Sequence, residues 1–325
     1  LNLIPYYGNI HTGSNIWKTP VQDTVHKTLK IGTRGSKLAL AQANEVKGLL
    51  IDAHDQLSED DIKIIVMSTR GDRVQDRNLS EIGGKGLFTE EIEQALYDGD
   101  IDIAVHSLKD MPTRLPTGLE LVCYLEREDV RDAFLSSKSK TLNDLPKGAV
   151  VGTSSLRRKA QALALRPDLE IVNFRGNVQT RLKKLDDKVA DATFLAMAGL
   201  NRLDITDPRV NPVNITDLLP AVAQGAITIE IASKNDKMRE LLLPLNHQET
   251  ELRVRAERTM LDILDGSCRT PIAGLATIDG NTMTLQGRVL TEDGLTDHFN
   301  KVSGDKHSPE AIGEELGQML KCASS

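Results

Sequence analysis

From residue 29 to about residue 219, short runs of apolar residues alternate with stretches whose apolar positions recur at helical spacing. The runs predict strands over residues 29–32, 62–67 and 101–105, and the amphipathic stretches predict helices over residues 37–51 and 89–97. Strands that alternate with helices are typical of βα units and of a mostly parallel sheet. Residues 62–67 are nearly all apolar, which favours a strand buried on both faces. We therefore predict the α/β fold class.

The same alternation continues beyond a charged stretch, residues 126–132, which indicates a crossing into a second α/β unit. There, a short apolar strand within residues 150–155 runs into the sequence GTSS, and a helix is predicted to begin near residue 156. A second strand at residues 171–174 leads through a turn of Arg175 and Gly176 into a helix predicted over residues 178–185. Residues 219–231 predict a turn and a long strand that returns to the first unit. The first domain is therefore predicted to be discontinuous.

The last part of the chain has a different pattern. A helix is predicted over residues 249–264, followed by strands joined by short turns at residues 270–278, 283–290 and 298–303, and Ser308 is expected to cap a final helix. This is a small α+β domain with an antiparallel sheet. The predicted parts of the chain are an N-terminal tail at residues 1–27, a first domain at 28–125 plus 222–243, a second domain at 130–219 and a third domain at 248–325.

Composition and charge narrow the class of protein. The 325 residues carry a formal net charge of -7, whereas a nucleic-acid surface normally needs a broad basic face. No run approaches the roughly 18 apolar residues that would span a bilayer. Three scattered cysteines fit neither a disulfide framework nor a metal site, and they favour a reducing compartment. We expect a soluble protein with no nucleic-acid or membrane partner and no metal.

Motifs for nucleotide and zinc chemistry are missing from the sequence. Residues 83–86 (GGKG) contain Lys85 but lack the upstream glycine and the following Ser or Thr of a Walker motif. There is also no strand-linked G-x-G-x-x-G, no H-E-x-x-H and no C-x-x-C. The sequence gives no support for ATP hydrolysis, dinucleotide binding or zinc catalysis.

Four arginines stand in two short stretches of this acidic chain. Arg157 and Arg158 end the sequence VGTSSLRR, and Arg175 and Arg181 lie in NFRGNVQTR. An arginine fork matches a carboxylate or phosphate, and a helix that starts beside it offers free backbone amides to the same ligand. Arginines on solvated helix faces are the alternative, which the recurrence after two predicted strands disfavours. The pattern predicts a binding site for a small polyanion.

Two further segments are candidates for the same site. Lys109 and Asp110 follow the strand at residues 101–105, and ligands of open α/β sheets bind outside the carboxyl ends of strands. A surface ion pair is the alternative for these two residues. Residues 68–86 are polar, contain glycine and are longer than most connections, so they form either a lid over a site or a disordered loop.

Cys268 lies in the sequence LDGSCRTPIAG, in a predicted loop beside Arg269. Nearby positive charge lowers a thiol pKa and a loop gives access to an electrophile, so this context favours a reactive thiol. An incidental loop cysteine is the alternative. Cys123 lies in an apolar run and Cys322 near the C-terminus, and we interpret both as structural or incidental.

Taken together, these segments resemble the hydroxymethylbilane synthase family, also called porphobilinogen deaminases. The resemblance runs from about Ile31 to the end of the chain and follows the family's order. It rests on IGTRGSKLAL, TRGD, GGKGLF, DIAVHSLKDMP, VGTSSLRR, FRGNVQTRL, LPAVAQGA and GSCRTPIAG.

The resemblance implies a fold, a cofactor and a reaction. The fold is two domains like a type II periplasmic binding protein, followed by a smaller domain that carries the cysteine. In the family, the matching cysteine holds a dipyrromethane cofactor in a thioether linkage, so Cys268 is the expected attachment site. Four porphobilinogen molecules are then added to this primer, each with loss of ammonia, and hydrolysis releases hydroxymethylbilane.

The resemblance also assigns roles to individual residues. Every pyrrole carries an acetate and a propionate, so the growing chain is a polycarboxylate that needs several cationic partners. Asp110 matches the family's catalytic aspartate, which stabilises cationic pyrrole intermediates and moves protons. Asp72, Lys85, Gln42 and Gln224 are expected to line the site or belong to its lid. The positions expected to bind the pyrrole carboxylates are Arg34, Ser36, Lys109, Ser155, Arg157, Arg158, Arg175 and Arg181.

Two other functions were weighed against this resemblance. A non-catalytic anion-binding protein would explain the arginines but leaves Cys268 and Asp110 without roles. An acyl-transfer enzyme that pairs Cys268 with His106 or His247 has no use for four arginines. The sequences AVAQGA and GSCRTPIAG resemble those of plant or algal members of the family. This resemblance suggests that the protein is located in the plastid stroma, and a bacterial cytoplasm is the alternative. We expect a monomer.

Overall fold

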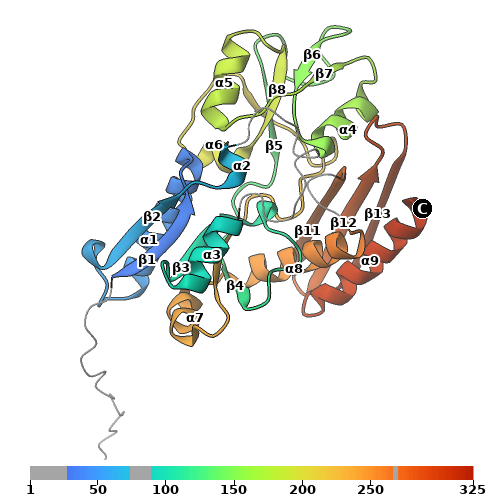
Figure 1. Cartoon of the computed structure of the whole chain (residues 1–325). Helices are drawn as coiled ribbons and strands as arrows, with labels where there is room; N and C mark the ends of the chain where they lie inside the picture. The colour runs from blue at the N-terminus through green and yellow to red at the C-terminus, as the bar shows by residue number, and fades with distance from the viewer. Residues whose placement is uncertain (1–27, 74–88, 266–269, 325) are drawn as a thin grey trace, which may run out of the picture.

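The computed structural model describes residues 28–73, 89–265 and 270–324 (Figure 1). Within these ranges the strands form two five-stranded sheets and one three-stranded sheet. Figure 1 shows the sheet of β1–β3 at the lower left, the sheet of β5–β8 above it, and β11–β13 with α8 and α9 at the lower right. The predicted tail at residues 1–27 and most of the predicted lid lie outside the described residues.

The first sheet has the strand order β2-β1-β3-β10-β4. β1 pairs in parallel with β2 and β3, and β10 is antiparallel to both of its neighbours. Helix α1 packs on β1 and β3, and α3 packs on β3. The strands are β1 (Leu29–Arg34), β2 (Ile62–Met67), β3 (Ile103–Ser107), β4 (Leu119–Tyr124) and β10 (Ile227–Ala232), and the helices are α1 (Lys37–Ala53), α2 (Arg70–Arg73), α3 (Glu90–Asp98) and α7 (Asp236–Leu242).

The second sheet repeats this plan with the order β7-β6-β8-β5-β9. β6 is parallel to β7 and β8, and β5 is antiparallel to β8 and β9. Its strands are β5 (Asp132–Ser136), β6 (Val150–Gly152), β7 (Glu170–Val172), β8 (Ala192–Ala196) and β9 (Val210–Pro212), and its helices are α4 (Leu156–Leu165), α5 (Val178–Asp186) and α6 (Met197–Asn201).

The chain passes between the two sheets twice. The first crossing segment, residues 126–131, joins β4 to β5, and the second, residues 213–226, joins β9 to β10. β10 therefore completes the first sheet after the second has been built, as the discontinuous first domain requires. The limits of the three domains stay a prediction.

The third sheet is antiparallel, with the order β11-β12-β13. Its residues share one apolar core with α8 and α9, which includes Val254, Met260, Leu285 and Leu316. This confirms the predicted α+β part of the fold. Its elements are α8 (Gln248–Ile263), β11 (Ile272–Asp279), β12 (Thr282–Leu290), β13 (Asp297–Asp305) and α9 (Pro309–Ser324).

One expectation about burial is wrong. β2 has the predicted limits, but only Ile62 in it is buried, and Val66 is 57% exposed. The reason is that β2 lies at the edge of its sheet, where one strand neighbour is missing. The strand predicted at residues 101–105 begins two residues later, at Ile103. Of the turn and long strand predicted over residues 219–231, the strand occupies Ile227–Ala232.

Candidate functional site

The predicted site residues gather where strands of both sheets end. Arg34 is the last residue of β1, and Lys109 and Asp110 lie in a 3-10 turn directly after β3. Residues after β6 and β7 supply the rest: Ser155, Arg157, Arg158, Arg175 and Arg181. Side chains just beyond the strand ends do not pack in the sheet and are free to face a ligand. The fold therefore brings residues from distant parts of the sequence together at these ends.

Arg157 and Arg158 share one buried carboxylate. Arg157 Nη1 lies 2.8 Å from Asp132 Oδ2, and Arg158 Nη2 lies 2.6 Å from Asp132 Oδ1. Asp132 has no exposed surface. Burial alone would raise the pKa of the Asp132 carboxyl, but the two guanidinium charges and their hydrogen bonds hold that pKa well below its usual range. Asp132 is therefore ionised at neutral pH.

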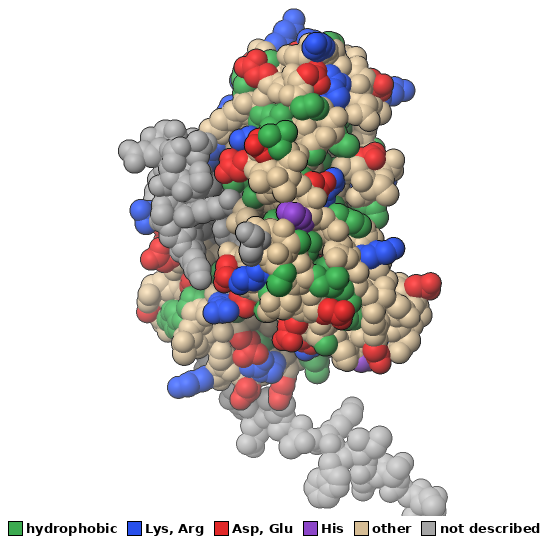
Figure 2. Space-filling model, turned by 90° about the vertical axis from the view of Figure 1, so that its right-hand side faces the viewer, with side chains coloured by type: hydrophobic (Ala, Val, Ile, Leu, Met, Phe, Trp, Pro, Cys, Tyr) green, Lys and Arg blue, Asp and Glu red, His purple; other side chains and the backbone are tan. Residues whose placement is uncertain are grey.

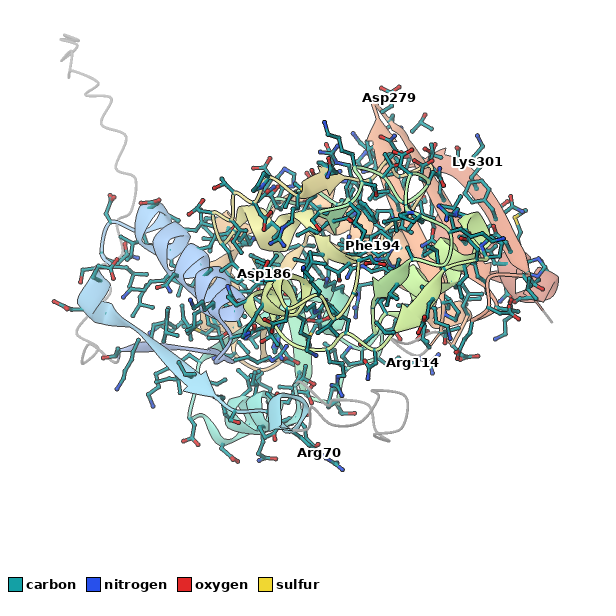
Figure 3. The ribbon with its side chains drawn as sticks, turned by 90° about the horizontal axis from the view of Figure 1, so that it is seen from above. Arg70, Arg114, Asp186, Phe194, Asp279 and Lys301 are labelled. Carbon is teal, nitrogen blue, oxygen red and sulfur yellow. The ribbon has the colours of Figure 1, made fainter. Side chains whose placement is uncertain are left out.

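Both arginines also bind backbone carbonyls. Arg157 Nη1 donates to Leu219 O at 2.8 Å, and Arg158 Nη1 donates to Phe194 O at 2.9 Å. Phe194 lies among the side chains in the middle of Figure 3, whereas Asp279 and Lys301 lie at the rim. Arg157 Nε is buried without a hydrogen-bond partner. A buried donor of this kind is available to a ligand acceptor.

Lys109 lies close to this cluster. Burial lowers the pKa of the Lys109 ammonium, and Arg158 and Arg157 lower it further, whereas Asp110 and Asp132 oppose the shift. A cation whose charged form is disfavoured by its surroundings gains when an anion arrives. Asp110 itself is exposed.

Arg181, on α5, interacts electrostatically with Asp110, which follows β3 of the first sheet. Its Nε donates to Gly176 O at 2.8 Å. Burial lowers the pKa of Arg181 to about 10, with Arg158 and Arg175 acting in the same direction and Asp110 opposing them. At neutral pH the guanidinium is still charged. Asp110 from the first sheet therefore lies among cations that come mainly from the second.

The two predicted serines begin helices. Ser36 Oγ caps α1 by accepting from Ala39 N at 3.2 Å, and Ser155 Oγ caps α4 by accepting from Arg158 N at 3.4 Å. An accepting hydroxyl keeps its own proton to donate. Each serine can therefore hold a helix start in place and still offer a hydrogen bond to a carboxylate.

The two predicted glutamines are buried and bind protein groups. Gln42 Nε2 donates to Ser107 Oγ at 2.9 Å, and Gln224 Nε2 donates to Val130 O at 2.8 Å and to Asp132 Oδ1 at 3.2 Å. These contacts support the end of β3 and the crossing segments. Asp72 belongs to α2, but its side chain lies outside the described residues, as do Lys85 and Cys268.

The sequence matches family models over most of its length. Residues 29–240 match the model described as "Porphobilinogen deaminase, dipyromethane cofactor binding domain", and residues 251–322 match "Porphobilinogen deaminase, C-terminal domain". The chain belongs to the porphobilinogen deaminase family. It is an enzyme of tetrapyrrole biosynthesis, and its cofactor is dipyrromethane.

Two porphobilinogen deaminases, one from a bacterium and one from a plant, are similar in sequence to this protein over most of its length. A porphobilinogen deaminase of Paracoccus denitrificans (strain Pd 1222) is 54% identical over 292 residues, which are 90% of this chain and 92% of the relative. A chloroplastic porphobilinogen deaminase of Pisum sativum is 55% identical over 270 residues, which are 82% of this chain and 73% of the relative.

Solved structures to which the chain shows a low similarity include periplasmic binding proteins. A substrate-binding protein of an ABC transporter from Coxiella burnetii has a TM-score of 0.41 and 16% identity, and covers 67% of this chain and 91% of its own. The aliphatic sulphonate binding protein SsuA from Escherichia coli has a TM-score of 0.38 and 14% identity, with 73% and 70% covered. These similarities are low, and the two-domain α/β fold rests on the strand orders given above.

The site fits the dipyrromethane cofactor of the family. A dipyrromethane with acetate and propionate side chains presents several carboxylates, and Lys109, Arg158 and Arg181 are cations whose pKa values are lowered by burial. The buried, unpartnered Nε of Arg157 is a further donor. Carboxylates would offset the burial of these cations and complete their hydrogen bonds.

Sequence reasoning missed Asp132 as a member of this site. It ends the charged stretch 126–132, which predicted a connection between domains. The signal was the run DAFLS, because the four residues after Asp132 are buried and a carboxylate at the start of such a strand needs a cation. The sequence could not show that the cations are Arg157 and Arg158.

A pocket of about 470 Å³ lies between the crossing segments, lined by residues 127–131 and 214–216. It contains none of the predicted site residues. Its two arginines are already paired, Arg127 with Glu257 and Arg131 with Asp129.

On the face drawn in Figure 2, basic and acidic side chains are interspersed rather than gathered into one patch. Among the described residues no group of three His, Cys, Asp or Glu side chains could hold a metal ion. No helix in the same part of the chain is long and apolar enough to cross a membrane.

Proposed function

We propose that this enzyme joins four porphobilinogen molecules to a dipyrromethane primer held on Cys268, with loss of one ammonia at each addition, and then releases hydroxymethylbilane by hydrolysis. The observation that supports this most is the cluster of cations around Asp110 at the ends of β3, β6 and β7. When bound, the dipyrromethane supplies the pyrrole carbon to which the first new unit is joined.

The cations and hydroxyls of the site are proposed to bind the pyrrole carboxylates. Guanidinium groups favour this because they offer two parallel donors to one carboxylate. The cluster draws on both sheets, so a chain with several carboxylates can be held at several points at once. The proposed binding residues are Arg34, Ser36, Lys109, Ser155, Arg157, Arg158, Arg175 and Arg181.

Asp110 is proposed as the catalytic carboxylate. Loss of ammonia and attack by a pyrrole carbon both develop positive charge near the pyrrole nitrogens, and a carboxylate there stabilises that charge and can accept a proton. Asp110 is exposed and lies close to Lys109 and Arg181.

Asp72 and Lys85 are proposed to act from the segment at residues 68–86. A segment that closes over the site would exclude water from an intermediate that water could intercept. Gln42 and Gln224 are proposed to hold other residues of the site in place. The Gln42 amide binds Ser107, and the Gln224 amide binds Asp132.

The proposed reaction is tested by its stoichiometry. The purified chain, loaded with cofactor, is incubated with porphobilinogen, and ammonia and hydroxymethylbilane are measured in the same sample. Four ammonia molecules for each hydroxymethylbilane are expected. Saturable porphobilinogen binding without ammonia release would contradict the proposal and favour an anion-binding protein.

We also propose that the enzyme works as a monomer in the plastid stroma. The similarity to a relative named chloroplastic supports the compartment. Light scattering should give a mass near 35.7 kDa, and a larger species would contradict the monomer. In fractionated cells of the source organism an antibody should detect the chain in the stromal fraction, and detection outside plastids would contradict that location.

A further inference from the structure

Asp132 is a buried charge that the proposed reaction does not use. Its carboxylate binds both arginines that end VGTSSLRR, through Oδ2 to Arg157 and Oδ1 to Arg158. Arg158 Nε adds a second bond to Oδ1 at 3.0 Å. Because a guanidinium that is bound through two of its nitrogens cannot rotate freely, Asp132 fixes the direction of the Arg158 fork.

Asp132 is also tied to both crossing segments. It directly follows the first, and the Gln224 amide of the second donates to Val130 O at 2.8 Å and to Asp132 Oδ1 at 3.2 Å. Leu219 O, in the second crossing segment, accepts from Arg157 Nη1 at 2.8 Å. The arginine pair is therefore attached to the two places where the chain passes between the sheets.

We propose that Asp132 is a positioning residue for pyrrole carboxylate binding. It holds the forks of Arg157 and Arg158 in their binding orientation and links that orientation to the crossing segments through Gln224. This inference rests on the proposed function, because the carboxylates are those of the cofactor and the growing chain.

Charge supports this role over that of an ordinary buried ion pair. Two guanidiniums buried side by side repel each other, and Asp132 compensates that repulsion before any ligand is present. Asp132 neutralises only part of the pair's charge, so attraction for a ligand carboxylate persists. Without Asp132, the two guanidiniums would keep only their carbonyl contacts, Arg157 with Leu219 O and Arg158 with Phe194 O, and would lose the shared carboxylate that offsets their repulsion.

The test separates positioning from stability. Asp132→Asn keeps the shape of the side chain but removes its charge, and Asp168→Asn is the matched control, because Asp168 pairs with Arg166 at 2.7 Å at the other end of α4. KM and kcat for porphobilinogen, the fraction carrying two pyrroles by intact mass, and the melting temperature are measured for both.

For Asp132→Asn we expect a lower loaded fraction and a KM raised by about tenfold or more, with kcat of the loaded fraction within about threefold of the parent. Asp168→Asn should match the parent in loading and KM. A folded Asp132→Asn with a lower melting temperature but parental loading and KM would overturn the proposal, since Asp132 would then serve stability alone.

Gln224→Leu covers the case in which Asp132→Asn does not fold. It leaves the Asp132 ion pairs in place and removes the amide that joins Asp132 to Val130. A KM raised several-fold supports the proposal, and a parental KM overturns it. The parent chain is assayed in parallel. If the parent releases no ammonia from porphobilinogen, the proposed function fails. If the parent is active and the variants have the parental KM, only the positioning role of Asp132 fails.

Discussion

Arg127 and Glu257 form an ion pair with almost no exposure to solvent. Arg127 Nη1 lies 2.6 Å from Glu257 Oε1, and the two side chains are 1% and 0% exposed. Glu257 also accepts from the backbone nitrogens of Ala223 at 2.7 Å and Ala276 at 2.8 Å. This one carboxylate therefore joins both crossing segments to α8 and β11.

The pair predicts a large loss of stability when one charge is removed. Glu257→Gln should lower the free energy of unfolding by about 3–5 kcal/mol, because Arg127 would be left buried without its counter-charge. Denaturant titration measures this. The control is Asp262→Asn, whose partner Arg114 is 73% exposed, and it should lose about 1 kcal/mol or less. Equal losses in the two variants would contradict the importance of burial.

Replacing the proposed catalytic carboxylate should affect turnover and leave folding unchanged. Asp110 is exposed, so Asp110→Asn should keep the parental melting temperature. In steady-state assays of chain loaded before the measurement, kcat should fall by about 10²–10⁴-fold. Asp279→Asn, at an exposed position of β11 that Figure 3 labels, should keep full activity. A near-parental kcat for Asp110→Asn would refute the role.

A buried acidic cluster predicts a pH-dependent stability. Burial raises the pKa of the Glu93 carboxyl. The negative charges of Glu230 and Glu90 raise this pKa further, whereas Thr89 and His106 oppose the shift. A raised carboxyl pKa stabilises the fold below the pKa of the unfolded chain, and this contribution is lost as the pH rises through the folded pKa.

Glu93→Gln should therefore gain stability relative to the parent as the pH increases from about 4 to 8. Melting temperatures across this range measure the difference. Glu90→Gln, at an exposed position of the same helix, should show a smaller change with pH. A constant difference between Glu93→Gln and the parent would contradict the raised pKa.

The turn between β12 and β13 packs directly on α4 through Gly294. Its φ is +73°, and a Cβ there would lie 2.5 Å from Ala160 O and 2.6 Å from Ala164 N. Gly280→Ala is the matched control, because Gly280 has a φ of +58° and nothing within 4 Å of its Cβ position. Both variants share the strain of a left-handed alanine, about 1 kcal/mol.

Gly294→Ala should lose a further 1–3 kcal/mol or so beyond Gly280→Ala, about the cost of overpacking. Denaturant titration of both variants measures the difference. Equal losses would show that the third domain does not depend on this contact with α4.

Local patterns predicted the elements well, and the partners of buried charges poorly. The limits of β2 followed from a nearly continuous apolar run, and the start of α4 followed from Ser155 and the arginines after it. The edge position of β2 depends on the order of strands, which a sequence pattern does not contain. Likewise, the rest of β5, a long loop and β6 separate Asp132 from its two arginines, so their pairing exists only in the folded chain.

Motif content predicted more of the site than periodicity did. The arginine stretches indicated a polyanion, and the strand ends placed Lys109 and Asp110 beside them, as the structure shows. The amide contacts of Gln42 and Gln224 were not foreseen, because a glutamine in a helix or loop has no signature for a buried partner. The roles of the individual residues stay predictions until variants are assayed.

The central claim, a dipyrromethane primer on Cys268, is tested most directly by intact mass under denaturing conditions with peptide mapping. Cys123 is an unsuitable attachment site, because burial raises the pKa of its thiol to about 12. The parent chain should carry two linked pyrroles on the peptide that contains Cys268, and Cys268→Ser should carry none. An unmodified Cys268 after incubation with porphobilinogen, in a chain that is folded, would contradict the account.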